Sequence, residues 1–330
     1  MRIVLDAMGG DYAPEVVVEG GVMAAREYGI EVVLVGPQEV VDAELAKHDT
    51  TGLSLPVVHA SQVIEMTDEP SMSARKKKDS SMVVGMNLVK NGEADAFTTA
   101  GNSGGALAAA LFRLGRIKGI KRPALSTVFP TQKGLCFICD VGANTDCRPV
   151  YLLQFGIMAS AYAERVLGIP NPRVGIVSNG EEEGKGNILV KEAFRLLKKS
   201  DLNFIGNLEG KDIPAGLADV VVTDGFSGNI VIKLSEGVAS LLMRVMEEEI
   251  KKSPMAVLGA LLARSALREV KSRLDYSEYA GAPLLGVDGV VIVGHGRSNA
   301  KAIKNMVRVG KESVEKGMLE ALKEGIAGSV

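Results

Sequence analysis

The sequence predicts an α/β protein: an open, mostly parallel, Rossmann-like sheet with helices on both faces. Ten short apolar runs are typical of strands, and most are continuously apolar, as expected for strands that are covered on both sides. Helical patterns lie between many of these runs, and this alternation favours a parallel sheet. A length of 330 residues suits one large domain or two smaller ones. We expect a single catalytic domain over residues 1–330.

The elements follow one another in a regular order along the chain. The expected strands are residues 2–7, 32–36, 56–60, 95–100, 125–130, 135–141, 173–178, 203–207, 219–225 and 289–295. The expected helices are residues 14–28, 80–91, 103–114, 149–167, 187–199 and, at most, 297–324. No internal repeat or low-complexity linker interrupts this order, so we expect no separate module.

Residues 226–273 break the alternation, because the pattern there is helical twice over with no strand between. Pro254 interrupts the first helix, so two consecutive helices form an antiparallel hairpin. A hairpin of that length projects from an α/β core unless another surface covers it. A second subunit is the simplest cover, and we therefore expect a homodimer.

Composition and charge exclude several classes of protein. The net charge is −2, Trp is absent and aromatic residues are few, which argues against a nucleic-acid binder. No apolar run reaches the length that spans a bilayer, and the first residues enter a strand without a signal segment. Cys136 and Cys139 form a C-x-x-C, but a strand there would point them to opposite faces. With Cys147, they are expected to be buried thiols of a reducing cytoplasm, and no metal site is expected.

Loops rich in Gly, Asn and Asp follow six of the expected strands. In open α/β sheets, ligands bind at the carboxyl ends of strands. One of these loops opens a helix, so Ser103 and Gly104 offer backbone N–H groups where the helix dipole favours an anion. The alternative is that these residues only make turns and helix caps. Six such loops together favour a phosphate-bearing ligand: DAMGGD, AGNSGG, DVGANTDC, SNGEEEGKGN, DGFSGN and GHGRSNA.

Familiar catalytic and cofactor motifs are absent from the sequence. The segment VLVGPQEV lacks the glycines of a dinucleotide fingerprint, and there is no Walker A motif. No G-x-S-x-G elbow is present. His48 and His59 lie away from the glycine-rich loops, whereas His295 lies within one and is either catalytic or structural. Without an obvious protein nucleophile, the nucleophile can be a substrate such as inorganic phosphate.

Eight ordered blocks resemble the phosphate acyltransferases of bacterial phospholipid synthesis, over essentially the whole chain. The resemblance implies a cytoplasmic, peripherally membrane-associated homodimer without a cofactor, similar in fold to phosphotransacetylases and the isocitrate dehydrogenase group. It implies transfer of a fatty acyl group from acyl carrier protein to inorganic phosphate, and use of the acyl phosphate by a membrane glycerol-phosphate acyltransferase. The blocks are DAMGGD, SARKKKDSSM, AGNSGGAL, DVGANTDCRP, GEEEGKGN, GNLEG, DGFSGN and YAGAPLLGVDG with GHGRSNAKAI.

The resemblance also implies roles for single residues. Lys185 would hold phosphate or an oxyanion, and Asn229 would donate its amide N–H to the thioester carbonyl; His295 is the third catalytic candidate. Without the resemblance, Lys185 would only pair with Glu181 or Glu182 on a solvated loop. The charge run SARKKKDSS is either a solvated face or a loop that attracts phosphate. The expected substrate-binding residues are Asp6, Gly9, Gly10, Asp11, Arg75, Lys78, Gly101, Asn102, Ser103, Gly104, Asp140, Asn144, Asp224, Ser227 and Asn299.

The tip of the hairpin, residues 254–263, carries no charge and is too short to span a bilayer. Cations follow it at i, i+4 and i+7 on one helix face. Such a tip suits anionic lipid, and its cations also suit an acidic acyl carrier protein. The alternative is that the leucines fill the dimer interface and the cations are solvated. The candidates for carrier-protein or membrane contact are Leu258, Leu261, Leu262, Arg264, Arg268 and Lys271.

Two other classes of function compete with this interpretation. One is a phosphotransacetylase-like enzyme that acts on coenzyme A thioesters, or a decarboxylating dehydrogenase with a similar fold. The other is a non-enzymatic membrane scaffold for lipid synthesis. Phosphate-dependent thiol release from each thioester, together with NAD reduction, would separate these possibilities.

Overall fold

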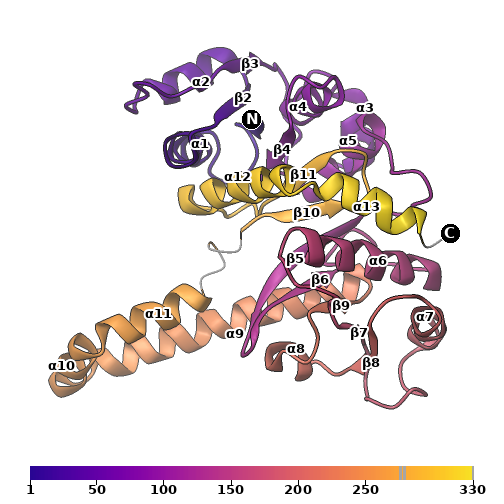
Figure 1. Cartoon of the computed structure of the whole chain (residues 1–330). Helices are drawn as coiled ribbons and strands as arrows, with labels where there is room; N and C mark the ends of the chain where they lie inside the picture. Colours follow the sequence, from indigo (N-terminus) through magenta and orange to yellow (C-terminus); the bar gives the residue numbers. More distant parts are fainter. Residues whose placement is uncertain (275–276, 278–279, 329–330) are drawn as a thin grey trace.

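An eleven-stranded sheet runs through the molecule, with helices packed against it (Figure 1). The structure, a computed structural model, describes residues 1–274, 277 and 280–328, with side chains of the segment before the first gap described as far as Val270. The strand order is β3-β2-β1-β4-β11-β10-β5-β6-β9-β7-β8. The expected α/β class with a mostly parallel open sheet is confirmed. The assignment of residues 1–330 to one domain stays a prediction.

The strands are short, with three to eight residues each. They are β1 (Arg2–Asp6), β2 (Glu31–Gly36), β3 (Val57–His59), β4 (Ala96–Thr99), β5 (Ala124–Thr131), β6 (Gly134–Cys139), β7 (Val174–Val177), β8 (Phe204–Leu208), β9 (Val220–Val222), β10 (Ala282–Leu285) and β11 (Val290–Val293). Among the described strands, β10 is antiparallel to both β11 and β5, and β5 is antiparallel to β6. The remaining neighbours are parallel.

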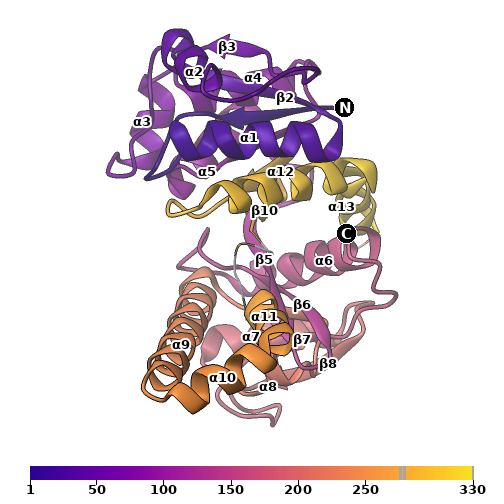
Figure 2. The same cartoon turned by 90° about the vertical axis from the view of Figure 1, so that its left-hand side faces the viewer.

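The helices connect the strands and form the projecting hairpin. They are α1 (Glu15–Tyr28), α2 (Gln38–Leu45), α3 (Pro70–Lys76), α4 (Ser81–Lys90), α5 (Ser103–Arg113), α6 (Pro149–Arg165), α7 (Ile188–Lys198), α8 (Asp212–Ala215), α9 (Gly225–Lys251), α10 (Pro254–Leu262), α11 (Arg264–Leu274), α12 (Ala300–Glu315) and α13 (Met318–Ala327). Figure 2 shows α1 and α12 side by side, so the C-terminal segment returns to the N-terminal half.

All ten expected strands are present, with small shifts at their ends, but β10 was missed. Pro283 lies inside β10, and a proline normally argues against a strand interior. The expected helix over residues 297–324 is two helices, because Gly317 adopts a left-handed conformation with φ of 68°. The short helices α2, α3 and α8 were also missed. The second helix of the hairpin is divided at Ala263 into α10 and α11.

The buried core lies on both faces of the sheet. Phe97, Phe137 and Phe155 are among its largest fully buried side chains. Within β6, Cys139 packs with Phe137 in one hydrophobic cluster, whereas Cys136 belongs to another. The expected burial of both thiols and their placement on opposite faces are therefore confirmed. Burial raises the pKa of Cys136 to about 12, so this thiol stays protonated.

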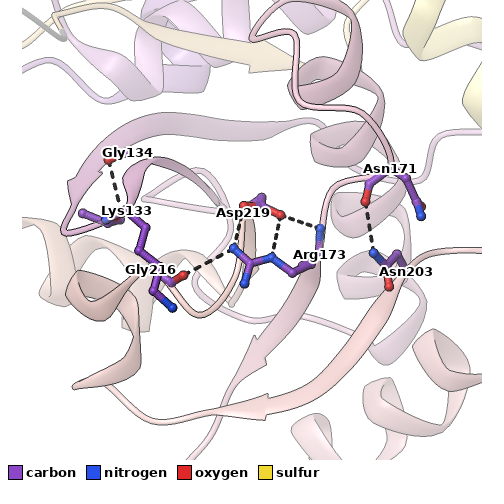
Figure 3. Close-up of polar contacts among 8 residues, drawn as sticks. Lys133, Gly134, Asn171, Arg173, Asn203, Gly216 and Asp219 are labelled. Atoms are coloured by element: carbon purple, nitrogen blue, oxygen red, sulfur yellow. Dashed lines mark hydrogen bonds and ion pairs between the residues drawn. The ribbon is translucent and has the colours of Figure 1, made fainter.

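An ion pair joins the amino ends of β7 and β9 (Figure 3). Arg173 Nε and Nη2 donate to the two carboxylate oxygens of Asp219 over 2.9 Å each. The same guanidinium reaches the Gly216 carbonyl oxygen at 3.3 Å, and Asp219 also accepts from the Arg173 backbone N–H at 2.8 Å. These bonds hold together the amino ends of two neighbouring strands, at the end of the sheet opposite the glycine-rich loops.

The hairpin of α9, α10 and α11 extends away from the sheet, with α10 at its far end (Figure 1). The expected projection of residues 226–273 is thus confirmed. Many apolar residues of α9 and α10 are exposed, and the exposed fraction of Leu262 is 83%. Among the described residues, no helix combines the length and the apolarity that a bilayer crossing requires.

Candidate active site

The strand order divides the molecule into an N-terminal half, built on β3-β2-β1-β4-β11-β10, and a second half, built on β5-β6-β9-β7-β8. A cavity of about 510 Å³ lies between these halves, where the loops after β4, β6 and β11 meet the first turns of α9. Apolar side chains of β5 and α9, including Val128, Phe129 and Ile232, form much of its wall. Polar groups reach it from both halves of the molecule. Those that bear on the chemistry are Ser103, Asn229, Lys233, Glu236, His295 and Ser298.

Asp6, at the end of β1, organises the loop in the N-terminal half. Its carboxylate is 1% exposed and accepts bonds from Thr99 Oγ1 at 2.7 Å and from the Met8 backbone N–H at 3.2 Å. Burial raises the pKa of Asp6, and the hydrogen bonds oppose this rise. A Cβ on Gly9 would lie 2.6 Å from Thr99 Oγ1, so glycine is required for this close approach. The structure thus places Asp6 beneath the loop, away from the cavity surface.

The loop after β1 is bonded to the loop after β11. The backbone N–H of Asp11 donates to the Gly296 carbonyl oxygen over 2.8 Å. A Cβ on Gly296 would lie 3.0 Å from Asp11 Oδ1, and Gly10 adopts a φ of 121° beside it. Two blocks nearly 300 residues apart in sequence therefore form one surface beside the cavity.

Asn102 caps α5 and fixes the helix end that faces the cavity. Its Oδ1 accepts from the Gly105 N–H at 3.0 Å, and its Nδ2 donates to carbonyl oxygens including that of Met66 at 3.2 Å. Gly101 and Ser103 line the cavity. Backbone N–H groups in the first turn of a helix have no intrahelical partner. Asn102 itself thus serves as a cap, and the binding of an anion at this end of α5 stays a prediction.

Asp140 has the corresponding place at the end of β6. It is fully buried and accepts from four backbone N–H groups, including those of Leu125 at 3.0 Å and Asn144 at 2.7 Å, as well as from Asn144 Nδ2 at 2.9 Å. Burial raises the pKa of Asp140, and these bonds oppose the rise. Both residues thus hold the shape of the loop that includes Gly142, a residue of the cavity wall.

The first turn of α9 is pressed onto this loop. A Cβ on Gly228 would lie 1.9 Å from the Asp140 carbonyl oxygen, which only glycine allows. Asp224 caps the helix by accepting from the Ser227 N–H at 2.8 Å and from Ser227 Oγ at 2.9 Å. The glycines of the DGFSGN block therefore bring Asn229 to the cavity.

His295 and Lys233 meet across the cavity from different halves of the molecule. His295 Nε2 contacts Lys233 Nζ, and His295 Nδ1 accepts from the Arg297 backbone N–H at 3.2 Å. Lys233 Nζ also lies 3.6 Å from the Glu236 carboxylate. Burial, and then the charge of Lys233, lower the pKa of His295, so the imidazole is neutral at pH 7. The cavity placement of His295 fits its expected role, which stays a prediction.

Lys233 was missed by the sequence analysis. It follows Asn229 by four residues and precedes Glu236 by three, so all three lie on one helix face. That spacing was visible in the sequence. Without knowledge of which face of α9 turns inward, however, it did not distinguish Lys233 from a solvated lysine.

Lys185 lies on the exposed loop between β7 and α7 and does not line the cavity. Asn179 Oδ1 accepts from the Gly186 N–H at 2.8 Å, and Gly186 has a φ of 96°. The alternative that Lys185 pairs with Glu181 or Glu182 is not what the structure describes. Instead, Glu181 pairs with another lysine: Lys211 Nζ lies 3.4 Å from Glu181 Oε1. The role of Lys185 stays a prediction.

Three other candidates lie away from the reactive groups or serve as caps. Arg75 stacks over the Phe112 ring at 4.8 Å, and Lys78 is exposed; neither lines the cavity. Asn299 caps α12 by accepting from the Ala302 N–H at 2.8 Å. Their proposed contacts with substrate stay predictions.

One cluster of three acidic residues in the described part of the chain has the spacing of a metal site. Glu181, Glu209 and Asp212 have oxygens within 4.8 Å of one another. Lys211 Nζ lies 2.5 Å from Glu209 and 3.4 Å from Glu181, so an ammonium already compensates these carboxylates. The expectation that the protein uses no metal stays a prediction.

The tip residues are exposed at the end of the hairpin. Leu258, Leu261 and Leu262 of α10 are 54%, 62% and 83% exposed. Arg264 and Arg268 of α11 are exposed as well. The side chain of Lys271 lies outside the described part of the structure.

Comparison with known proteins shows one family over nearly the whole chain. The fatty acid synthesis protein family matches residues 1–321. The phosphate acyltransferase of Pelotomaculum thermopropionicum is 52% identical over 326 residues, which cover 99% of this chain and 95% of that protein. The phosphate acyltransferase of Geobacter sulfurreducens is 50% identical over 324 residues, which cover 98% of this chain and 94% of that protein.

Solved structures show the same fold at low sequence identity. A phosphotransacetylase from Streptococcus pyogenes matches with a TM-score of 0.64 and 18% identity over 96% of this chain and 94% of that one. The EutD phosphotransacetylase from Staphylococcus aureus matches with a TM-score of 0.61 and 18% identity over 95% and 94%. The expected likeness in fold to phosphotransacetylases is therefore confirmed.

Proposed function

Because the chain belongs to the fatty acid synthesis protein family, whose matched relatives are phosphate acyltransferases, we propose that it transfers a fatty acyl group from acyl carrier protein to inorganic phosphate. Family membership itself shows an acyltransferase with phosphate as the acceptor. The carrier-protein donor, the assembly, the membrane contact and the residue roles are the finer parts of the proposal.

The observation that carries the proposal is the cavity between the two halves of the molecule. Its volume of about 510 Å³ is within the usual range for small-molecule sites. Apolar side chains of β5 and α9 offer a wall for an acyl chain, and polar groups converge beside it. A thioester can thus lie with its chain on the apolar wall and its carbonyl carbon near Asn229.

The reaction replaces one bond to the carbonyl carbon. A phosphate oxygen forms a C–O bond, the C–S bond breaks, and the proton that phosphate loses balances the one that the thiolate gains. A thiol with a pKa of about 8.5 leaves with modest help. Most of the acceleration can therefore come from positioning and from donors aimed at the developing oxyanion.

Two groups have the places that this chemistry needs. Asn229 can donate its side-chain N–H to the carbonyl oxygen as negative charge develops there. The N-terminal turn of α5, at Ser103, can bind phosphate through backbone N–H groups. In a crystal soaked with phosphate, we expect anion density at Ser103 and Gly104. Density elsewhere, with this helix end empty, would contradict the assignment.

Lys185 requires a movement of its loop to take part. The loop of residues 178–187 is exposed, and a Cβ on Gly184 would meet no atom within 4 Å. We infer that the loop closes over bound substrate and brings the Lys185 ammonium to the phosphate or the oxyanion. Cross-linking of Lys185 to a bound acyl-phosphate analogue would support this closure, whereas an analogue that binds but does not cross-link to Lys185 would oppose it.

The donor is identified by an assay of thiol release. We expect the purified chain to release thiol from acyl carrier protein thioester only when phosphate is present, and faster than from the coenzyme A ester. A preference for coenzyme A would indicate the phosphotransacetylase-like alternative, and NAD reduction would indicate a dehydrogenase. No turnover of any thioester would leave a scaffold role and overturn the proposal.

We propose that the chain is a homodimer joined along α9. Exposed apolar side chains recur along this helix at about every fourth position, as on a packing face. Leu234 is 64% exposed at the middle of that stripe. We expect Leu234→Glu to be monomeric by light scattering, whereas a dimer of unchanged stability would contradict this interface. The stripe consists of Phe226, Ile230, Leu234, Val238, Leu241 and Val245.

The free tip of the hairpin fits a membrane surface that carries anionic lipid. Leu258 and Leu261 are exposed in a helix without charged residues, and Arg264 and Arg268 follow directly. The variant with both Leu258→Glu and Leu261→Glu should stay dimeric and active but no longer sediment with anionic vesicles. If it becomes monomeric, or if sedimentation is unchanged, the membrane role is wrong. Membrane association would place acyl phosphate beside a membrane glycerol-phosphate acyltransferase at the cytoplasmic surface.

A further inference from the structure

One face of α9 carries a cation into the cavity. Asn229, Lys233 and Glu236 line the cavity from successive turns of the helix. Among the described residues of the cavity wall, Lys233 is the single lysine or arginine. Its side chain is 43% exposed, so it is open to a ligand that enters. A positive charge in a mostly apolar cavity is a strong attraction for a small anion, because the local dielectric is lower than in water.

The imidazole of His295 adds a second donor at the same place. Its Nδ1 lies 3.2 Å from the Arg297 backbone N–H, a bond that requires the tautomer with the ring proton on Nε2. Nε2 is also the atom in contact with Lys233 Nζ, and because an ammonium can only donate, that contact requires the other tautomer, with the proton on Nδ1. An acceptor that accepts from Lys233 Nζ in place of Nε2 leaves the ring in the tautomer that the Arg297 N–H favours, in which Nε2–H can donate to the same acceptor. An oxyanion with several oxygens meets that condition.

We propose that Lys233 and His295 together form the phosphate-binding pair of this cavity, with Lys233 supplying the charge and His295 an uncharged N–H donor. This inference rests on the proposed function, since it assigns the acceptor substrate to two named residues. Ser103, at the N-terminus of α5, lines the same cavity and can add backbone donors. Phosphate held by Lys233 would lie about one helical turn from Asn229, the proposed partner of the carbonyl oxygen.

Glu236 forms an ion pair with Lys233 in the structure. Its carboxylate lies 3.6 Å from Lys233 Nζ, so it partly neutralises the ammonium when no anion is bound. Phosphate must compete with this carboxylate for Lys233. Loss of the Glu236 charge should therefore tighten phosphate binding, a result that a purely structural role for the Lys233–Glu236 contact does not predict.

The pKa of His295 depends on the charges around this pair, so it can be used to detect phosphate bound there. The charged groups that act on it are Lys233 and Glu236 of α9, Arg297 of its own loop and Asp11 of the loop after β1. Burial and the Lys233 charge lower its pKa, while the two carboxylates raise it. A bound phosphate dianion adds negative charge beside the ring and should raise the pKa of His295 further.

The decisive experiment measures phosphate affinity and the His295 pKa on the full chain by NMR. Lys233→Met should weaken phosphate binding at least about tenfold, because a charge-assisted bond is lost. Lys233→Arg should stay within about threefold of the parent, since it retains the charge. Glu236→Gln should bind phosphate more tightly. In Lys233→Met, the pKa of His295 should be higher without phosphate and should rise less when phosphate is added.

Lys311→Met is the matched control. Lys311 is also a helical lysine with an acidic partner, Glu315 at 2.8 Å, but it does not line the cavity. It should leave phosphate affinity and the His295 titration unchanged. Parental phosphate affinity in Lys233→Met, or no phosphate binding by the parent chain, would overturn the assignment. A parent that binds phosphate but turns over no thioester would instead contradict the proposed function.

Discussion

The two ends of β9 are built in opposite ways. At its amino end, Asp219 is held by three bonds from Arg173, each 2.8–2.9 Å long. At its carboxyl end, Asp224 caps α9, and the helix then carries Asn229 and Lys233 to the cavity. The strand between them has only three residues. A stabilising ion pair and a candidate active site are therefore separated by one short strand.

The difference lies in where the hydrogen-bonding capacity is used. The Asp219 carboxylate is occupied by guanidinium and backbone groups of the protein, so it contributes to the cohesion of the sheet edge. At the carboxyl end, buried carboxylates such as Asp140 use their capacity to shape loops, which leaves other polar side chains, such as Asn229 and Lys233, to face the cavity. Substitutions at the amino end should thus change stability alone, and substitutions of cavity groups should change turnover alone.

The largest effect should come from the contact that joins the two regions, the packing of α9 on the loop after β6. In Gly228→Ala, a Cβ 1.9 Å from the Asp140 carbonyl oxygen would force the helix away from that loop. We expect the free energy of unfolding to fall by about 3 kcal/mol, with loss of turnover because Asn229 is displaced. Urea unfolding at fixed protomer concentration measures this change.

Gly237→Ala is the control for that substitution in the same helix. A Cβ at Gly237 would meet no atom within 4 Å. Alanine should stabilise the helix by about 0.5–1 kcal/mol, because glycine is the weaker helix former. Similar destabilisation by both substitutions would show that the close approach of α9 to Asp140 is not the cause.

The second prediction concerns the cavity end and the adjacent loop. Asn229→Ala and Lys185→Ala should each lower turnover at least about tenfold, a barrier increase of ~1.4 kcal/mol or more. Their thermal unfolding should match the parent, since neither residue is part of the core. Initial rates with saturating thioester and phosphate, with unfolding curves beside them, are the measurement. Near-parental rates in both variants would remove both residues from the mechanism.

The smallest effect should come from the amino end. Asp219→Asn should lower the free energy of unfolding by about 1 kcal/mol at pH 7, because the ion pair is partly exposed. Its hydrogen bonds with Arg173 lower the pKa of Asp219 below the ordinary value. The stabilisation is therefore complete above the unfolded pKa of about 3.9 and is lost as the pH falls through the folded pKa.

The free energy of unfolding, measured at pH 7 and below pH 4, tests the direction of this pH dependence. The difference in stability between parent and Asp219→Asn should shrink as the pH is lowered, while turnover at pH 7 stays parental. A difference that persists unchanged in acid would mean that packing, and not the ion pair, stabilises this end of the sheet.

The sequence by itself determined the local elements and the order in which they occur. Continuous apolar runs such as those of β1 and β6 predicted covered strands, and the alternating direction of side chains along a strand placed Cys136 and Cys139 on opposite faces. Glycine, asparagine and aspartate after the strands predicted loops and helix starts, because those residues are required there by backbone geometry. Pro283 concealed β10, since a proline normally argues against a strand.

Only the tertiary structure decided which loops meet. Lys233 and His295 are 62 residues apart, and Asp11 and Gly296 are still more distant, yet both pairs are in contact. Helix periodicity shows that Asn229 and Lys233 share a face, but the direction of that face depends on how α9 packs against the loop of Asp140. That packing follows from contacts between segments far apart in the chain. Local propensity and spacing do not contain this information, and a cavity between two halves of a sheet exists only after both have folded.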